Sequence, residues 1–118
     1  MKRARRFQDL VVWQKAHQLV LRIYEVTKSF PDNEKFGLIS QMRRAAVSIP
    51  ANIAEGFKKR SEKDKAKFYN ISQGSLEELR YYLILAKDLK YLDNIEELSD
   101  LIDEVGRMLH GLIRSIEN

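Results

Sequence analysis

Basic side chains gather at two places in the chain, and their chemistry suits phosphate binding. One cluster lies within the first six residues and the other between residues 58 and 67. Lys and Arg bind nucleic-acid backbones by neutralising phosphates and releasing the cations condensed on them. A simpler interpretation is that the second cluster only solvates a loop and that the first belongs to a disordered tail. The candidate phosphate-binding residues are Lys2, Arg3, Arg5, Arg6, Lys58, Lys59, Arg60, Lys63, Lys65 and Lys67.

Aromatic residues lie close to both basic clusters and could stack on unpaired bases. They are Phe7, Phe57, Phe68 and Tyr69. Phe57 and Phe68 also fall on apolar stripes, a pattern that predicts core positions. No RNP, KH or zinc-finger pattern is present, so we expect any nucleic-acid binding to depend mainly on charge and shape.

Five polar residues between positions 41 and 55 recur in steps of three or four and therefore share one side of a helix. An apolar row follows another side of the same segment, as in a helix with two packed faces. The polar row could fix the register against the Gly74–Ser75 segment of a neighbouring helix, because each unpaired buried group costs about 1–3 kcal/mol. It could also line a ligand or nucleic-acid groove at a subunit junction. The row comprises Gln41, Arg44, Ser48, Asn52 and Glu55.

Catalytic and metal-binding patterns are missing from the sequence. His17 and His110 are the two histidines, and neither has a partner at metal-binding spacing, although Glu55 is expected not far from them. His17 falls on an apolar stripe, which predicts a hydrogen-bonded core residue. The chain has no Cys nucleophile, no glycine-rich phosphate loop after a strand and no Glu-x-x-His motif. We therefore expect no enzyme activity, no cofactor and no bound metal.

Helical periodicity and capping signals divide the chain into four helices. Five Gly and two Pro residues are too few for a turn-rich fold. The first helix should end where Phe30–Pro31 forces an extended backbone. Ser61 with Asp64 should cap the third helix, and Asp93 with Glu96 should cap the fourth. The expected helices are Asp9–Ser29, Asp32–Lys59, Ser61–Tyr91 and one that begins near Asp93.

Four helices with short connections predict an all-α, antiparallel up-down-up-down four-helix bundle. We expect residues 1–8 to form a basic N-terminal tail and residues 9–118 to form the single bundle domain. Residues 1–92 hold 19 Lys and Arg against 10 Asp and Glu, whereas residues 93–118 hold 2 against 7. In such a bundle both basic clusters meet at one end. The acidic residues expected at the opposite end are Asp32, Glu34, Asp93, Glu96, Glu97 and Asp100.

The first and third expected helices carry more apolar surface than one bundle can bury. Residues 81–86, YYLILA, are apolar on all sides of a helical turn and should be buried on every side. Contiguous exposed apolar surface usually marks an interface. We therefore predict a homo-oligomer.

The composition also bears on the cellular compartment. Cys is absent, which excludes disulfides and thiolate metal sites. No apolar run approaches the roughly 18 residues of a membrane span, and the first ten residues lack the apolar stretch of a signal peptide. We expect a soluble, cytoplasmic protein with no membrane partner.

The chain resembles a known family at specific residues. The run SIPANIAEG at residues 48–56 is the most specific part, and the likeness extends over nearly the whole chain from Phe7 onward. The sequence is similar to the small four-helix bundle proteins named after open reading frames in intervening sequences of 23S rRNA genes. The matching residues are Phe7, Asp9, Leu10, Val12, Trp13, Ala16, Tyr24, Thr27, Phe30, Pro31, Glu34, Gln41, Arg43, Arg44, Ala45, Ser48–Pro50, Asn52–Gly56, Phe68, Gly74, Ser75, Glu78 and Leu79.

This resemblance implies a bundle assembled as a ring of five, with no established activity for most members. It also implies similarity to the basic accessory protein of diversity-generating retroelements, which binds nucleic acid. The sequence departs from the pattern at Gln73, where a basic residue would be expected.

We therefore predict a non-catalytic oligomer that binds RNA or DNA through its basic end, as an accessory or chaperone-like factor. The alternative is a structural or adaptor oligomer whose partner is a protein, docked on the acidic fourth helix. The salt dependence of binding to unrelated nucleic acids separates the two, because a protein adaptor should show almost none.

Overall fold

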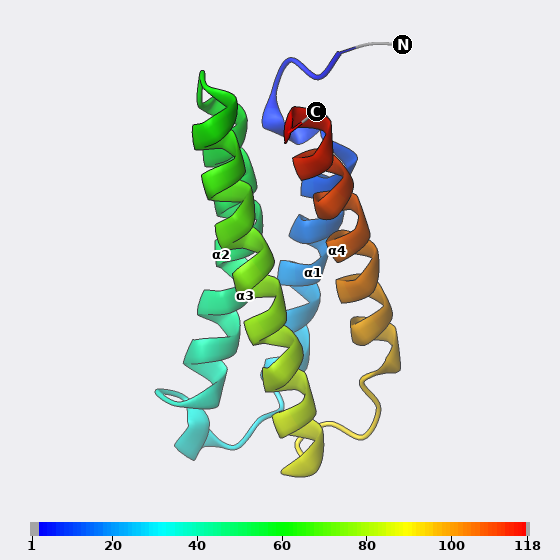
Figure 1. Cartoon of the computed structure of the whole chain (residues 1–118). Coiled ribbons are helices and arrows are strands. Elements are labelled where there is room, and N and C mark those ends of the chain that lie inside the picture. Colours follow the sequence, from blue (N-terminus) through cyan, green and yellow to red (C-terminus); the bar gives the residue numbers. More distant parts are fainter. Residues whose placement is uncertain (1–2, 118) are drawn as a thin grey trace.

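A computed structural model describes residues 3–117 of the chain, without the side chain of Glu117. Within this range each helix packs against the next one along the chain, and α1 packs against α4 to close the bundle. The four helices run alternately up and down in a body of 44 × 24 × 20 Å (Figure 1), so the predicted all-α four-helix fold is confirmed. The described range contains no strand, and its elements are η1 (Phe7–Asp9), α1 (Val11–Thr27), η2 (Asp32–Glu34), α2 (Leu38–Lys58), α3 (Glu62–Asp88) and α4 (Glu96–Glu117), where η marks a 3-10 helix.

Capping side chains mark where α3 and α4 begin, whereas Leu10, before α1, forms no capping bond. The helix α1 begins at Val11, two residues later than expected, because η1 and an extended Leu10 precede it. At the start of α3, Ser61 Oγ accepts a hydrogen bond from the backbone N–H of Asp64 at 3.1 Å, as predicted. At the start of α4 the accepting oxygen belongs to Asn94, 2.8 Å from the backbone nitrogen of Glu96. The prediction that Asp93 caps α4 was therefore wrong by one residue.

The end of α3 is closed by a residue in the left-handed conformation. Lys90 has φ 66°, a region that L-residues adopt at a cost. The backbone N–H of Tyr91 donates to the carbonyl of Ala86 at 2.9 Å, and that of Lys90 donates to the carbonyl of Lys87 at 2.9 Å. This pair of bonds is the Schellman motif, in which Gly usually occupies the position that Lys90 holds here.

One stripe from each helix builds the core. In α4 the core seam comprises Leu98, Ile102, Val105 and Leu109, which recur in steps of three and four. Burial of these stripes is the main favourable term in the stability of the bundle. The largest fully buried side chains are Leu19, Ile23, Met42, Ile49, Ile53, Tyr69, Leu79, Leu83, Ile102, Val105 and Leu109.

Two predicted core assignments were wrong. His17 is exposed, because α1 turns the neighbouring row with Ala16 and Leu19 toward the core. In the segment of residues 81–86, Tyr81 is 56% exposed and Ile84 47% exposed. Every helix of a four-helix bundle turns only one side toward the core, so these two side chains stay on the surface of the monomer.

Gly56 of α2 lies in close contact with α3. A Cβ atom on Gly56 would lie 2.6 Å from Cε1 of Tyr69. Gly74 lies in the segment of α3 that the sequence analysis placed against the polar row of α2. It is exposed, and nothing lies within 4 Å of the position that a Cβ atom would take there. The close approach therefore depends on the glycine of α2 and not on that of α3. No helix within residues 3–117 combines the length and apolar character needed to cross a membrane.

Candidate nucleic-acid interface

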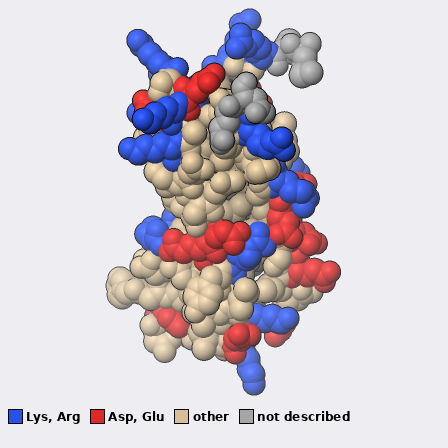
Figure 2. Space-filling view, in the orientation of Figure 1, with Lys and Arg blue, Asp and Glu red and all other residues tan. Residues whose placement is uncertain are grey.

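Both basic clusters lie at the same end of the bundle, which we call the basic pole. At this end α1 and α3 begin and α2 and α4 end (Figure 1). Figure 2 shows Lys and Arg side chains around this upper end, with a patch of Asp and Glu among them. Lys2 lies outside the described residues. The described basic residues of the pole are Arg3, Arg5, Arg6, Lys58, Lys59, Arg60, Lys63, Lys65 and Lys67.

The turn between α2 and α3, together with the helix ends on either side of it, carries four exposed cations, which we call the exposed cations of the α2–α3 turn. Lys58, Arg60, Lys63 and Lys67 are all exposed. None of the four forms an ion pair with a carboxylate in the described part of the chain. The turn is short, because α2 ends at Lys58 and α3 begins at Glu62, directly after its cap Ser61. Four positive charges are thus held close together and are available to phosphates.

Two lysines of the same cluster have partners within the protein. Lys65 is half-buried, and its Nζ donates to the carbonyls of Phe57 at 2.6 Å and Gly56 at 3.3 Å. The same Nζ lies 5.3 Å from the ring centroid of Phe57. Lys59 Nζ lies 4.9 Å from the ring centroid of Phe68. Lys65 therefore differs from the other residues of the basic pole, because its ammonium group caps the last carbonyls of α2.

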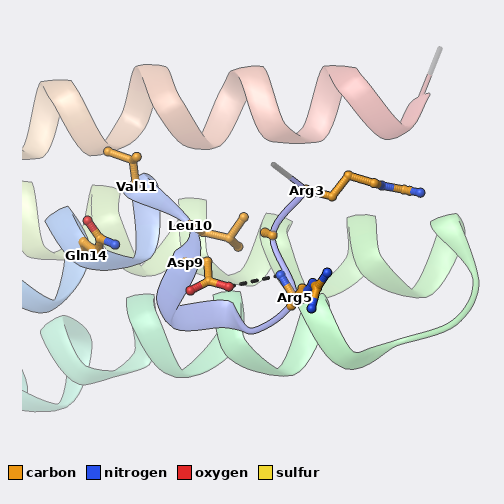
Figure 3. A pocket seen from close by; sticks show the side chains of 7 residues that line it. Arg3, Arg5, Asp9, Leu10, Val11 and Gln14 are labelled. Atoms are coloured by element: carbon orange, nitrogen blue, oxygen red, sulfur yellow. Dashed lines mark hydrogen bonds between the residues drawn. The ribbon is translucent and has the colours of Figure 1, made fainter. Parts of the chain in front are cut away.

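The N-terminal arm, residues 3–10, is held in place by Asp9. Its Oδ2 accepts hydrogen bonds from the backbone N–H groups of Arg5 and Arg6, each at 3.1 Å. Figure 3 shows the Asp9 carboxylate turned toward the backbone of Arg5. These two donors stabilise the charged carboxylate and so hold the pKa of Asp9 below its ordinary value. The arm borders an open groove of about 1300 Å³, lined by Arg3, Ala4, Arg5, Asp9, Leu10, Val11 and Gln14.

The inner part of the polar row joins α2 to α3. Ser48 Oγ and Ser75 Oγ lie 2.8 Å apart. Asn52 Nδ2 donates to the carbonyl of Ser48 at 2.8 Å and to its Oγ at 3.0 Å. Ser72, fully buried on α3, donates from its Oγ to the carbonyl of Ile49 at 2.8 Å. The Ser48–Ser75 and Ser72–Ile49 bonds join α2 to α3, as the structural interpretation of the row predicts, whereas the bonds of Asn52 lie within α2 and hold Ser48.

The outer part of the polar row is more exposed. Arg44 Nε donates to Gln41 Oε1 at 3.0 Å, and the Arg44 guanidinium pairs with Glu78 of α3. Glu78 also accepts a hydrogen bond from the Tyr82 hydroxyl at 2.6 Å, which raises the pKa of Tyr82 because the carboxylate favours the protonated phenol. Glu55 is exposed and takes no part in these contacts among the described residues.

Three cations along the sides of the bundle pair with carboxylates of α4, and at the basic pole Arg6 pairs with Asp9 at 3.7 Å. Lys15 lies 3.3 Å from Glu104, and Arg22 lies 3.0 Å from Glu97. Arg80 of α3 pairs with Asp103 at 2.6 Å. Three acidic side chains of α4 are thus engaged by α1 and α3. The end opposite the basic pole is mixed and not uniformly acidic, because four exposed lysines lie there: Lys28, Lys35, Lys87 and Lys90.

The histidines lie apart from the basic clusters. The ring of His17 stacks on Trp13, with centroids 5.1 Å apart and planes at 8°. Both rings line an apolar groove of about 360 Å³ between α1 and α2, to which Pro50 also contributes. His110 lies in a different groove, between α3 and α4. Among residues 3–117, no three His, Asp or Glu side chains converge as metal ligands would.

The fold and the charges define a class of protein: a small helical bundle with ion pairs between helices along its sides and a cluster of exposed cations where α2 meets α3. The family model of 23S rRNA-intervening sequence proteins matches residues 8–111. The chain therefore belongs to this family, whose name refers to an intervening sequence of 23S rRNA.

Comparison with solved structures supports the same assignment. The chain is similar to the crystal structure of a protein of unknown function from the S23 ribosomal protein family of Bacteroides thetaiotaomicron. The TM-score is 0.80 at 27% identity, and the match covers 87% of this chain and 98% of that one. Comparison with curated proteins finds no significant match.

Proposed function

We propose that the protein is a non-catalytic accessory protein that assembles with copies of itself and binds RNA or DNA phosphates through the basic pole. The observation that carries this proposal is the concentration of exposed cations where α2 meets α3, at Lys58, Arg60, Lys63 and Lys67. Lys15, Arg22 and Arg80 each neutralise a carboxylate of another helix, and therefore contribute to the fold. The exposed cations of the α2–α3 turn have no such partner among the described residues.

The family assignment is compatible with this proposal. The family name refers to 23S rRNA, which suggests an RNA-related role. The likeness to the accessory protein of diversity-generating retroelements stays a prediction from the sequence. The adaptor alternative required a protein partner on the acidic face of α4. Glu97, Asp103 and Glu104 of that helix already pair with cations of α1 and α3, which makes this face less suited to a charged partner.

The test compares two quadruple variants that lose the same charge at opposite ends of the bundle. One changes Lys58, Arg60, Lys63 and Lys67 to Gln, and the other changes Lys28, Lys35, Lys87 and Lys90 to Gln. Binding of a labelled RNA duplex is followed by fluorescence anisotropy over a range of salt concentrations. The first variant should flatten the slope of log affinity against log salt by about 0.9 for each lost phosphate contact, and the second should leave it nearly unchanged.

Two results would contradict the proposed function. The first is that the parent shows no salt-sensitive binding to RNA or DNA, in which case the adaptor alternative takes its place. The second is that both variants lose affinity equally, because this would indicate attraction to overall charge without a site. Circular dichroism checks that both variants keep the helix content of the parent.

Self-assembly is supported by apolar side chains that the monomer leaves exposed. Tyr81 and Ile84 on α3, Leu21 on α1 and Phe36 before α2 are all on the surface. Covering them would remove apolar area from water at about 25 cal/mol per Å². The resemblance to the family suggests five copies. Light scattering should give a mass several times 13.9 kDa, and a monomer mass would remove the oligomer from the proposal.

A further inference from the structure

The aromatic rings of the basic pole already have partners within the protein. A lysine ammonium lies over Phe68 at 4.9 Å and another lies over Phe57 at 5.3 Å. Tyr69 is only 2% exposed, and its ring is packed against Gly56. Phe7 packs edge-on against Trp13, with ring centroids 5.1 Å apart. Of the rings that the sequence offers for base stacking, Tyr69 is therefore buried, and Phe7, Phe57 and Phe68 are half-buried and each contact another side chain.

Uncovering these rings would disturb the fold. The ammonium group over Phe57 is also fixed by two carbonyl oxygens at the end of α2. A base that stacked on Phe57 would have to displace Lys65 and leave those carbonyls without their cap. Proteins that bind single strands use aromatic rings with free faces as platforms for successive bases. Among the described residues, none of these four rings of the basic pole is exposed.

We propose that the basic pole binds base-paired nucleic acid through its phosphates and discriminates against unpaired strands. This inference rests on the proposed function and names its ligand class. A duplex presents one charge per about 1.7 Å of axis, twice the density of one strand, and its bases need no stacking partner from the protein. The exposed cations of the α2–α3 turn and the arginines of the N-terminal arm supply contacts to phosphates alone.

The experiment measures the affinity of the full-length protein for three end-labelled polymers of equal length: an RNA duplex, a DNA duplex and oligouridine. The two duplexes should bind alike, because phosphate is the group that they share. They should bind about sixfold more tightly than oligouridine at 0.1 M salt. The slope of log affinity against log salt is about 0.9 per phosphate contact for a duplex and about 0.7 for a single strand. With about four contacts and equal affinities at 1 M salt, the two affinities differ by about 0.8 log units at 0.1 M salt, which is the sixfold ratio.

Variants make the absence of stacking directly testable. Phe57→Leu and Phe68→Leu keep an apolar side chain at each position and should leave affinity for oligouridine within twofold of the parent. A lost stacking contact would instead weaken binding by at least about fivefold. Trp13, the only tryptophan, should keep its fluorescence when oligouridine is added.

The results separate this inference from the proposed function. Salt-sensitive binding of oligouridine as tight as that of the duplexes, quenching of Trp13 or a loss in either Phe variant would overturn the inference and leave the proposed function standing. Binding to only one of the two duplexes would also overturn recognition by phosphates alone. If no polymer binds with salt sensitivity, the proposed function itself fails.

Discussion

The α-carbon of Gly56 faces the ring of Tyr69 at the junction of α2 and α3, and a Cβ atom there would lie 2.6 Å from Cε1. Gly56→Ala should therefore destabilise the protein, even though Ala normally stabilises a helix relative to Gly by about 0.5–1 kcal/mol. Overpacking a buried site costs about 1–3 kcal/mol, so the free energy of unfolding in urea should fall.

Gly74→Ala is the matched control on α3. Nothing lies within 4 Å of its Cβ position, so the free energy of unfolding should rise by as much as about 1 kcal/mol. Equal effects of the two substitutions would show that helix propensity alone governs both sites.

Lys65→Met should lower stability and leave nucleic-acid binding unchanged. The thioether keeps the apolar stem but removes two hydrogen bonds to the carbonyls of Gly56 and Phe57, at a cost of about 1 kcal/mol. Lys67→Met, at an exposed position of the same helix, should leave the stability unchanged and reduce the salt slope of nucleic-acid binding. Chemical denaturation and the salt slope of RNA binding measure the two effects, and a reduced slope for Lys65→Met would contradict its assignment as a cap.

Asp9 should make the conformation of the N-terminal arm depend on pH. Its pKa in the folded protein is below the ordinary 3.8, so its stabilising contacts are complete above that value and are lost as the pH falls through the lower folded pKa. The backbone N–H signals of Arg5 and Arg6 should therefore shift together on acidification in an NMR titration. Asp9→Asn should abolish the common shift, and its persistence in this variant would exclude Asp9 as the titrating group.

Asn52→Leu tests the polar row. Asn52 is half-buried and donates both to the carbonyl and to the Oγ of Ser48. Removing these bonds should reduce the free energy of unfolding by about 1 kcal/mol. Glu55→Gln, at the exposed end of the row, should stay within about 0.5 kcal/mol of the parent. A thermal denaturation profile of Asn52→Leu that coincides with the parent's would show that the row does not stabilise the α2–α3 contact.

Lys90→Gly should stabilise the protein. Lys90 has φ 66°, and relief of the left-handed strain should exceed the entropic cost of Gly and leave a net gain of about 0.5–1 kcal/mol. Lys87→Gly, in the last turn of α3, should instead lose about 1 kcal/mol. Urea denaturation of the two variants gives both values, and a loss of stability in Lys90→Gly would contradict the role of the motif.

Periodicity and capping chemistry were sufficient to predict four helices, because these signals are local, but α2 begins at Leu38 and not near Asp32, where the chain forms η2. The Ser61 cap and the α4 seam from Leu98 to Leu109 follow directly from spacing. The rotation of α1 about its axis was harder to predict. Two adjacent apolar rows competed for the core, and the row with His17 was assigned there wrongly because its apolar neighbours outweighed the polar ring.

The candidate site was predictable in its residue types but not in the partner of each residue. All the lysines between residues 58 and 67 looked equivalent in the sequence. Only the fold brings the carbonyls of Gly56 and Phe57 to Lys65, nine and eight positions away respectively. The tight contact was likewise assigned to Gly74 and not to Gly56, because spacing shows where small residues lie but not how far apart two helices are.

The order in which the helices touch has a consequence for how the chain folds. Contacts between α1 and α2, α2 and α3, and α3 and α4 all join neighbours in the sequence, and only the contact of α1 with α4 spans the chain. Bundles dominated by such local contacts fold within microseconds to milliseconds, since little loop-closure entropy is lost before contacts form. The ion pairs Lys15–Glu104 and Arg22–Glu97 belong to that last closure. The α1–α4 seam is thus the place where the bundle would close last and open first.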